Sequence, residues 1–241
     1  EGGVGGGSAV DRRGVSMPAE VAGGFEVRFD GRQVWAFDPA EHPLGEDGRR
    51  FVPWHREVAR RLRGRAVVSL HLQGRSVHEQ EVRFTDDEGG ADFTDAAGHP
   101  IMVDKWGLIQ RPFSGRGEGV VGELLDVTEQ VIEVLARDCG VHAWLAFGSL
   151  LGAVRAGKAI GHDSDVDLAY LSDQPSPAAM TLEMYELSRA LRRAGFNVLN
   201  KSGAFITVVF AGSDGAQSSI DLYTCFHLGD TLYETATVRE P

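Results

Sequence analysis

The sequence predicts an α+β protein in which a small antiparallel β-rich domain precedes an α/β domain with a mixed sheet. Three observations support this fold class. Residues 25–113 combine short alternating apolar and polar stretches with tight turns. Residues 107–119 are Gly-rich and polar and include Pro112, which is typical of a linker. From residue 120, helical and strand-like segments alternate, which is the pattern of an α/β domain.

The length and composition allow two small domains. The chain has 241 residues, of which 42% are apolar, as in globular proteins with a proper core. We expect a flexible lead-in over residues 1–24, because this segment is Gly-rich and lacks hydrophobic periodicity. The β-rich domain then covers 25–113 and the α/β domain covers 114–241.

Two dipeptides predict hairpins in the β-rich half. Asp30-Gly31 divides an alternating stretch over 25–37, and this pair suits a two-residue turn in which both residues take positive φ. Gln73-Gly74 repeats the arrangement within 66–84, and residues 93–103 are expected to add another strand pair. These hairpins predict a small antiparallel sheet or sandwich.

An arginine-rich segment lies between the hairpins, where residues 53–65 are expected to form one short helix. Its arginines could dock an anionic polymer or a phosphorylated lipid surface, but a solvated helix face is the interpretation we favour. The histidines of this half match no metal-binding spacing and are expected on the surface or in turns. The residues concerned are Arg49, Arg50, Arg56, Arg60, Arg61, Arg63 and Arg65, with Glu57 among them, and His71, His78 and His99.

The second half predicts the order α-β-α-β-α-β-β-β. Apolar residues at helical spacing predict an amphipathic helix over 120–138. Ser176 followed by Pro177 predicts the start of another helix, which reaches Gly195. The remaining elements are a buried strand at 142–147, a helix at 150–156 and strands at 164–171, 196–200, 204–210 and 218–226.

Three aspartates on two of these strands are the candidate catalytic and metal-binding residues. Asp165 and Asp167 alternate in one strand and therefore project to the same face. Asp221 lies in a later apolar strand, and it supplies a third carboxylate if that strand pairs beside the first. Three such carboxylates suit Mg²⁺ or Mn²⁺ and in-line phosphoryl transfer. In the plainer interpretation, Asp221 is a water-facing residue at a strand edge.

The Gly148-Ser149 turn predicts a phosphate site. It places backbone N–H groups at the start of a helix, where the helix dipole also favours an anion. Arg155 and Lys158 follow on the same helix or just after it and are expected to reach that anion. Asp163 comes directly before the acidic strand, either as part of the site or as an ordinary loop residue.

The stretch 142–171 resembles the LicD family of nucleotidyltransferase-fold proteins, which includes bacterial phosphocholine transferases, fukutin and fukutin-related protein. The resemblance covers about 120–226. The chain departs from the family pattern at Gly161-His162 and at Ser164. His162 could bind phosphate or transfer protons, although a rim position without a catalytic role is the favoured interpretation. The matching residues are Gly148, Ser149, Leu150, Leu151, Gly152 and Arg155 for the first motif, and Asp163, Asp165, Asp167 and Asp221 for the acidic positions.

The resemblance implies transfer of an alcohol phosphate from a CDP-alcohol to a hydroxyl of a glycan or cell-envelope polymer, with release of CMP. Asp165 and Asp167 would hold the metal, and Asp221 would complete this site or accept the proton of the attacking hydroxyl. Substrate binding would fall to Gly148, Ser149, Arg155, Lys158, His162 and Asp163. The family usually continues beyond the third carboxylate, so a C-terminally truncated catalytic domain is expected, with the β-rich domain serving the polymer acceptor.

Two alternatives remain open. The same carboxylates could transfer NMP from a nucleoside triphosphate and release pyrophosphate, or the chain could be a silent polymer-binding protein. A net charge of −11 argues against nucleic acid as a partner. No stretch approaches the roughly 18 apolar residues of a membrane span. Cys139 and Cys225 are expected as free thiols, so we expect a cytoplasmic protein, compatible with peripheral association at the inner face of the membrane.

Overall fold

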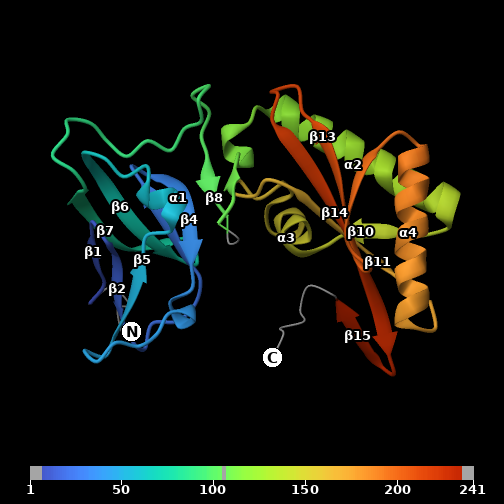
Figure 1. Ribbon diagram of the computed structural model, residues 1–241, viewed down its shortest axis with the longest axis horizontal. Coiled ribbons are helices and arrows are strands. Elements are labelled where there is room, and N and C mark those ends of the chain that lie inside the picture. Colours follow the sequence, from blue (N-terminus) through green and yellow to red (C-terminus); the bar gives the residue numbers. More distant parts are fainter. Residues whose placement is uncertain (1–6, 105–106, 235–241) are drawn as a thin grey trace. The chain divides into compact units, whose positions relative to one another are not determined.

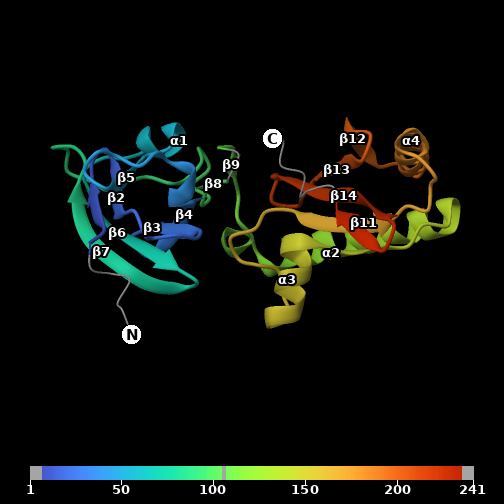
Figure 2. The same ribbon diagram turned by 90° about the horizontal axis from the view of Figure 1, so that it is seen from below.

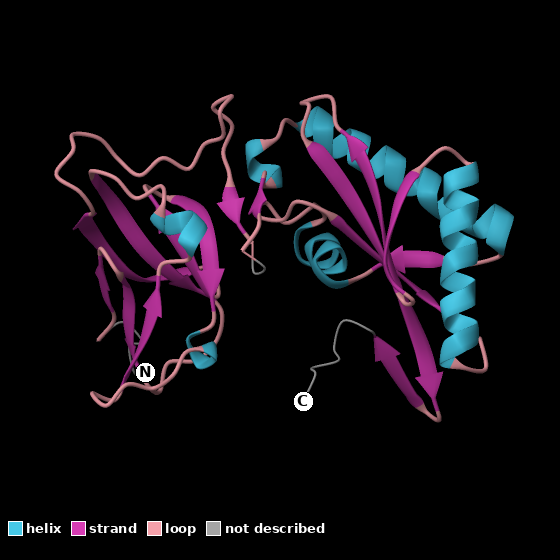
Figure 3. Ribbon diagram, in the orientation of Figure 1, coloured by secondary structure: helices cyan, strands magenta, loops and turns pink. Residues whose placement is uncertain are grey.

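The computed structural model describes residues 7–104 and 107–234 and divides the chain into two compact units, Glu1–Gly115 and Arg116–Pro241. The first unit consists mainly of strands, whereas the second combines helices with a mixed sheet (Figure 3). The α+β prediction is therefore confirmed. Within the described ranges, no helix has the length and apolar character needed to cross a membrane.

Unit 1 contains two larger antiparallel sheets around a single core, and residues 102–103 and 109–110 form a further two-stranded sheet. Both larger sheets contribute fully buried side chains to the core, including Val15 and Met17 from one and Phe25, Val27 and Leu70 from the other. The first sheet has the order β1-β2-β5 and the second β4-β3-β6-β7. The elements are β1 (Ala9–Asp11), β2 (Gly14–Pro18), β3 (Phe25–Phe29), β4 (Arg32–Phe37), η1 (Pro39–Glu41), β5 (Arg49–Pro53), α1 (Arg56–Ala59), β6 (Arg65–Leu72), β7 (Arg75–Arg83), β8 (Met102–Val103), β9 (Ile109–Gln110) and η2 (Phe113–Gly115).

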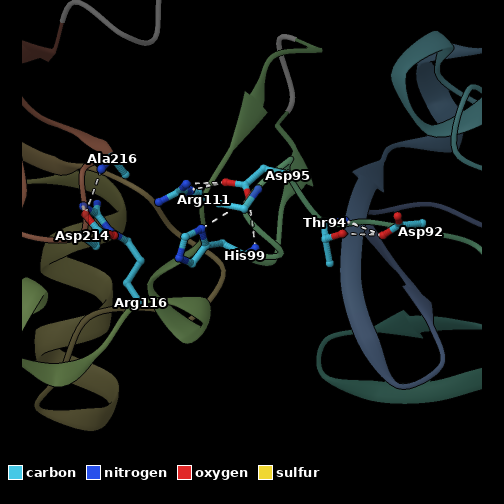
Figure 4. Close-up of polar contacts among 9 residues, drawn as sticks. Asp92, Thr94, Asp95, His99, Arg111, Arg116, Asp214 and Ala216 are labelled. Atoms are coloured by element: carbon cyan, nitrogen blue, oxygen red, sulfur yellow. Dashed lines mark hydrogen bonds and ion pairs between the residues drawn. The ribbon is translucent and has the colours of Figure 1, made fainter.

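The two hairpins predicted at Asp30-Gly31 and Gln73-Gly74 are confirmed. All four residues have positive φ, with values of 49°, 81°, 52° and 76° in chain order. The third predicted pair, within 93–103, is reduced to a single bridge, and β8 pairs with β9 instead. The Asp95 carboxylate explains this difference, because it accepts hydrogen bonds from the backbone of residues 97 and 99 and pairs with Arg111 (Figure 4).

The expectation of a flexible lead-in over 1–24 is wrong for residues 9–18. They form β1 and β2, and β2 pairs with β5. Val10, Val15 and Met17 are buried in the core of unit 1. Gly14 adds to the glycine content that suggested a flexible segment. A glycine is required at this position, because a Cβ there would lie 2.2 Å from the Val52 carbonyl oxygen. Residues 1–6 of the predicted lead-in lie outside the described residues.

The arginine-rich segment does not form one outward-facing helix. Helix α1 has only four residues and ends at Ala59, whereas Gly64 takes a positive φ of 52° and β6 begins at Arg65. Glu57 alone accepts ion pairs from three arginines, which lie within one turn of it. Three other arginines of this region bind oxygen atoms elsewhere in unit 1. The arginines around Glu57 are Arg56, Arg60 and Arg61. The other three are Arg49, which binds Ser16, Arg50, which binds the His42 carbonyl oxygen, and Arg65, which binds Glu81.

Unit 2 is built on a sheet with the strand order β10-β11-β14-β13-β12, and β15 extends it as a hairpin with β14 (Figure 1). Among the described strands of this sheet, β11 and β14 run parallel and the other pairs run antiparallel. The elements are α2 (Glu118–Cys139), β10 (Ala143–Leu145), α3 (Phe147–Ala156), β11 (Val166–Leu171), α4 (Pro177–Arg193), β12 (Asn197–Ser202), β13 (Phe205–Ala211), β14 (Gln217–Leu228) and β15 (Thr231–Glu234).

The two faces of this sheet differ. Leu168, Tyr170 and Leu222 are buried on one face, where α2 and α4 pack together, and the Tyr170 hydroxyl donates to Glu183 of α4 over 3.2 Å. Because side chains alternate along a strand, Asp167 and Asp221 project to the opposite face. Helix α3 starts on that side and stands away from the sheet (Figure 2). The acidic residues therefore lie on the face that α2 and α4 leave open.

Three local expectations for unit 2 require correction. Residues 142–147 do not form a buried strand, because β10 lies at the sheet edge and its Trp144 is 40% exposed. Strand β15 has no counterpart among the predicted elements. The predicted linker 107–119 contains β9 and η2, and its Arg116 is a buried residue of unit 2. The Arg116 guanidinium forms two bonds to the Asp214 carboxylate, over 2.9 and 3.0 Å (Figure 4).

Candidate metal centre

The parallel pairing of β11 and β14 creates an acidic cluster. In this register Asp167 lies opposite Asp221, and Asp165 precedes β11 by one residue. Oxygen atoms of Asp165, Asp167 and Asp221 all lie within 4.8 Å of one another, and the three residues are partly buried. The sequence prediction that a later strand brings a third carboxylate beside the first two is thus what the sheet topology produces. We refer to these three residues as the acidic triad.

Gly148 allows the chain to pass close to the triad. The backbone turns at Phe147, which has an unusual positive φ of 41°, and α3 begins there. A Cβ on Gly148 would lie 2.6 Å from Asp163 Oδ2 and 3.6 Å from Asp167 Oδ2. Asp163 therefore packs directly against the first turn of α3. Any larger residue at position 148 would displace the Asp163 carboxylate.

Ser149 supports the acidic strand from the same turn. Its hydroxyl oxygen accepts a hydrogen bond of 2.9 Å from the backbone N–H of Asp167. The N–H of Ala146 donates to the carbonyl oxygen of Asp167 over 2.9 Å. These two bonds fix the Asp167 backbone from the side of α3. In this geometry the Gly-Ser turn orients an aspartate, a role that the sequence did not suggest.

A second glycine closes the loop that returns to the triad. Gly152 is buried in α3, and a Cβ there would lie 2.6 Å from the carbonyl oxygen of Lys158. Gly157 ends the helix with a positive φ of 62°. The loop can therefore double back over α3 and deliver Asp163 to the start of the same helix. The Gly-x-x-x-Gly spacing within 148–152 thus serves two close backbone approaches.

The electrostatics of the triad favour a cation. Burial, and to a smaller extent the charge of Asp165, raise the pKa of the Asp221 carboxyl to about 6, although the hydroxyls of Thr207 and Tyr223 and the charge of Lys201 oppose this rise. Three carboxylates this close repel one another unless protons or cations intervene. Mg²⁺ and Mn²⁺ prefer oxygen ligands of this kind. The residues present therefore fit a bound metal ion.

The cationic residues predicted for substrate binding lie further away. Helix α3 starts at Phe147 rather than at residue 150, so Arg155 falls in its last turn, roughly 12 Å along the axis from the first residue. Arg155, Lys158 and His162 are all exposed. Among the described residues, no hydrogen bond or ion pair joins these three to the triad. Contact of Arg155 with a bound phosphate stays a prediction.

Several residues near the triad escaped the sequence analysis. Thr207 lies opposite Asp221 in the β13–β14 pairing, and Tyr223 lies two residues after it on the same face. The Tyr223 spacing was a readable signal, because residues i and i+2 of a strand share a face. Thr207 had no such signal, since its place depends on the register between two strands. Lys201, Phe147 and Phe205 complete this set.

The mixed sheet of unit 2 is open on one face and carries three clustered carboxylates there. These lie beside the start of α3, at Gly148-Ser149. This is the arrangement expected of a nucleotidyltransferase-type domain. Residues 140–240 match the sequence model of the LicD/FKTN/FKRP family, nucleotidyltransferase domain. The match confirms the predicted resemblance to this family for residues 140–240. It indicates a transferase.

Other comparisons add little. No curated protein sequence matches the chain. Among solved structures, the chain is similar to that of Cid1, a protein described as having RNA terminal uridylyl transferase activity. The identity is 19%, the TM-score is 0.33, and the similarity covers 45% of this chain and 31% of the Cid1 chain. A similarity of this extent carries no argument about substrates.

Proposed function

We propose that unit 2 transfers an alcohol phosphate from a CDP-alcohol to a hydroxyl of a glycan or cell-envelope polymer and releases CMP. Phosphocholine, ribitol phosphate and glycerol phosphate are the donor groups that this chemistry suits. The observation that carries the proposal is the acidic triad, whose oxygens lie within 4.8 Å of one another. The match of residues 140–240 to the sequence model of the LicD/FKTN/FKRP family supports it.

The reaction makes one bond and breaks one. The acceptor oxygen attacks the phosphorus that carries the alcohol, a new O–P bond forms, and the bond between this phosphorus and the bridging oxygen breaks. The bridging oxygen leaves with CMP. A divalent cation at the triad would neutralise charge on the diphosphate and acidify the attacking hydroxyl. The acceptor proton must pass to a base.

Each triad residue has a role in this proposal. Asp165 and Asp167 would hold the cation, with Asp167 fixed by the bond to Ser149. Asp221 would complete the metal site or take the acceptor proton, and a pKa of about 6 suits a base near neutral pH. Helix α3 starts without a side-chain cap, so its first turn presents N–H donors and the positive end of its dipole to a phosphate.

The remaining parts of the proposal concern the rest of the chain. Residues 114–241 would be the catalytic domain, and residues 25–113 would serve as an accessory domain for the polymer acceptor. Arg155, Lys158 and His162 would contact substrate only if the donor reaches along α3. The expected location is the cytoplasm, which is compatible with peripheral association at the inner face of the membrane.

Product analysis tests this function. The full chain is incubated with CDP-choline, CDP-ribitol, CDP-glycerol, CTP or ATP, each with Mg²⁺ or with EDTA, and CMP and pyrophosphate are measured by mass spectrometry. We expect Mg²⁺-dependent CMP from one CDP-alcohol. Asp167→Ala should abolish it, whereas Asp173→Ala, which removes an exposed carboxylate after β11, should not. Pyrophosphate from a triphosphate, without CMP, would instead establish NMP transfer.

A further inference from the structure

Tyr223 lies beside the acidic triad and is not explained by the proposed chemistry. It follows Asp221 by two residues in β14, so both side chains share the open face of the sheet. Its hydroxyl donates a hydrogen bond of 3.3 Å to Asp221 Oδ2. The same carboxylate is a proposed metal ligand. Tyr223 is therefore in contact with the candidate centre through one oxygen of Asp221.

Two phenylalanines fix the orientation of the Tyr223 ring. Phe205 lies opposite Tyr223 in the β13–β14 register, and the two rings stack with centroids 4.5 Å apart and an interplanar angle of 4°. Phe147, at the start of α3, meets the Tyr223 ring edge-on, at 5.1 Å and 85°. Contacts from β13 and α3 together restrict the ring. The direction of its hydroxyl group is restricted as well.

Packing alone does not account for the hydroxyl group. A phenylalanine would make the same two ring contacts and would avoid placing a polar group in a partly buried position. The hydroxyl instead lies beside the Asp221 carboxylate, to which it donates its hydrogen bond. A phenol hydroxyl is protonated near neutral pH, as a hydrogen-bond donor to a carboxylate must be.

We propose that Tyr223 is a positioning residue of the metal centre. By holding Asp221 Oδ2, its hydroxyl would fix the orientation of the carboxylate with which Asp221 would bind a cation. Partners that hydrogen-bond to metal ligands in this way commonly change metal affinity 10-fold to 100-fold when they are removed. The inference rests on the proposed metal-binding role of the acidic triad.

The test compares Mn²⁺ binding by the wild-type chain of residues 1–241 and by its Tyr223→Phe variant, measured by isothermal titration calorimetry. We expect the dissociation constant to rise about 10-fold. The unfolding temperature in EDTA should not fall, because the ring contacts with Phe205 and Phe147 are retained. Tyr233→Phe is the matched control. Tyr233 also stacks on a phenylalanine, Phe226, but it is 42% exposed and lies on β15, and its variant should bind Mn²⁺ like the wild type.

A second variant separates orientation from simple loss of the hydroxyl. Phe205→Leu keeps Tyr223 but removes the stacked ring that restricts it, so we expect weaker Mn²⁺ binding here too. Unchanged affinity in Tyr223→Phe would overturn the inference. So would a loss of affinity accompanied by a lower unfolding temperature in EDTA, since general loosening would then explain it. Absence of binding by the wild type would instead refute the metal-binding role of the triad, which Asp167→Ala checks independently.

Discussion

Replacing Asp221 by asparagine should stabilise the metal-free protein at neutral pH. The folded-state pKa of about 6 exceeds the ordinary value of 3.8, so the folded protein binds this proton more tightly than the unfolded chain does. Stability therefore falls as pH rises through the interval between these two values. The difference corresponds to at most about 3 kcal/mol above pH 7. Asparagine removes the charge and keeps an oxygen that Tyr223 can bind.

Hydrogen exchange can measure this effect on unit 2 alone. In EDTA, the slowest amides of β11 and β14 report the free energy of opening of this unit. We expect Asp221→Asn to raise that free energy by about 1–3 kcal/mol at pH 7.5, and by much less at pH 4, where the wild-type carboxyl is protonated in the folded state. Asp173→Asn, a substitution of an exposed carboxylate, should have no such effect.

Mg²⁺ provides the reciprocal measurement. At 100 times its dissociation constant, the ion should stabilise the wild type by about 2.7 kcal/mol and the variant by less, so the difference between them should shrink or reverse. An Asp221→Asn variant that is less stable than the wild type in EDTA at pH 7.5 would refute the reasoning. Asp221 would then be held by favourable contacts rather than opposed by burial and the charge of Asp165.

Three further substitutions probe other features of unit 2. Gly148→Ala should displace the Asp163 carboxylate and weaken Mn²⁺ binding measurably in calorimetry, with less than about 1 kcal/mol of change in stability, because alanine favours helices. Arg116→Ala removes a buried guanidinium from Asp214 and should cost about 3 kcal/mol of unfolding free energy in urea denaturation. Ser176→Ala removes the N-cap of α4 and should cost about 1 kcal/mol in the same assay.

Matched variants make these outcomes decisive. Gly122 lies in α2, and a Cβ added there would meet no neighbouring side chain or strand within 4 Å. Gly122→Ala should therefore not affect Mn²⁺ binding. If Gly122→Ala and Gly148→Ala weakened Mn²⁺ binding equally, the role of Gly148 would be contradicted. Arg137 forms an exposed pair with its neighbour Asp138, and Arg137→Ala should leave the unfolding free energy nearly unchanged. If Arg116→Ala or Ser176→Ala cost no more than Arg137→Ala, the corresponding contact would not stabilise unit 2.

Local signals predicted the parts of the fold that local chemistry determines. Asp30-Gly31 specifies a tight turn through the positive φ of both residues, and Ser176-Pro177 starts α4 by capping it. The apolar pattern of α2 was equally readable, although the helix extends from 118 to 139. The alternation of Asp165 and Asp167 placed them on one face before any pairing was known. In each case the information lies within a few residues.

Long-range contacts were harder to predict. The strands at 9–18 are stabilised by pairing with β5, which their Gly-rich composition does not reveal. Arg116 looked like a linker residue because its partner, Asp214, lies almost a hundred residues away. Arg155 was placed too near the start of α3 because the helix start was set at 150 instead of 147. The contact of Thr207 with Asp221 depends on register, which one sequence does not specify.

The parallel pairing of β11 with β14 also has a consequence for the order of events in folding. α4, β12 and β13 all lie between the two strands in the sequence, so Asp167 and Asp221 meet only after a long chain closure. A metal ion therefore has no assembled ligand set to bind during early collapse. We expect Mg²⁺ to slow the unfolding of unit 2 and to leave its folding rate nearly unchanged. The ion would then stabilise the folded domain kinetically and would not nucleate its folding.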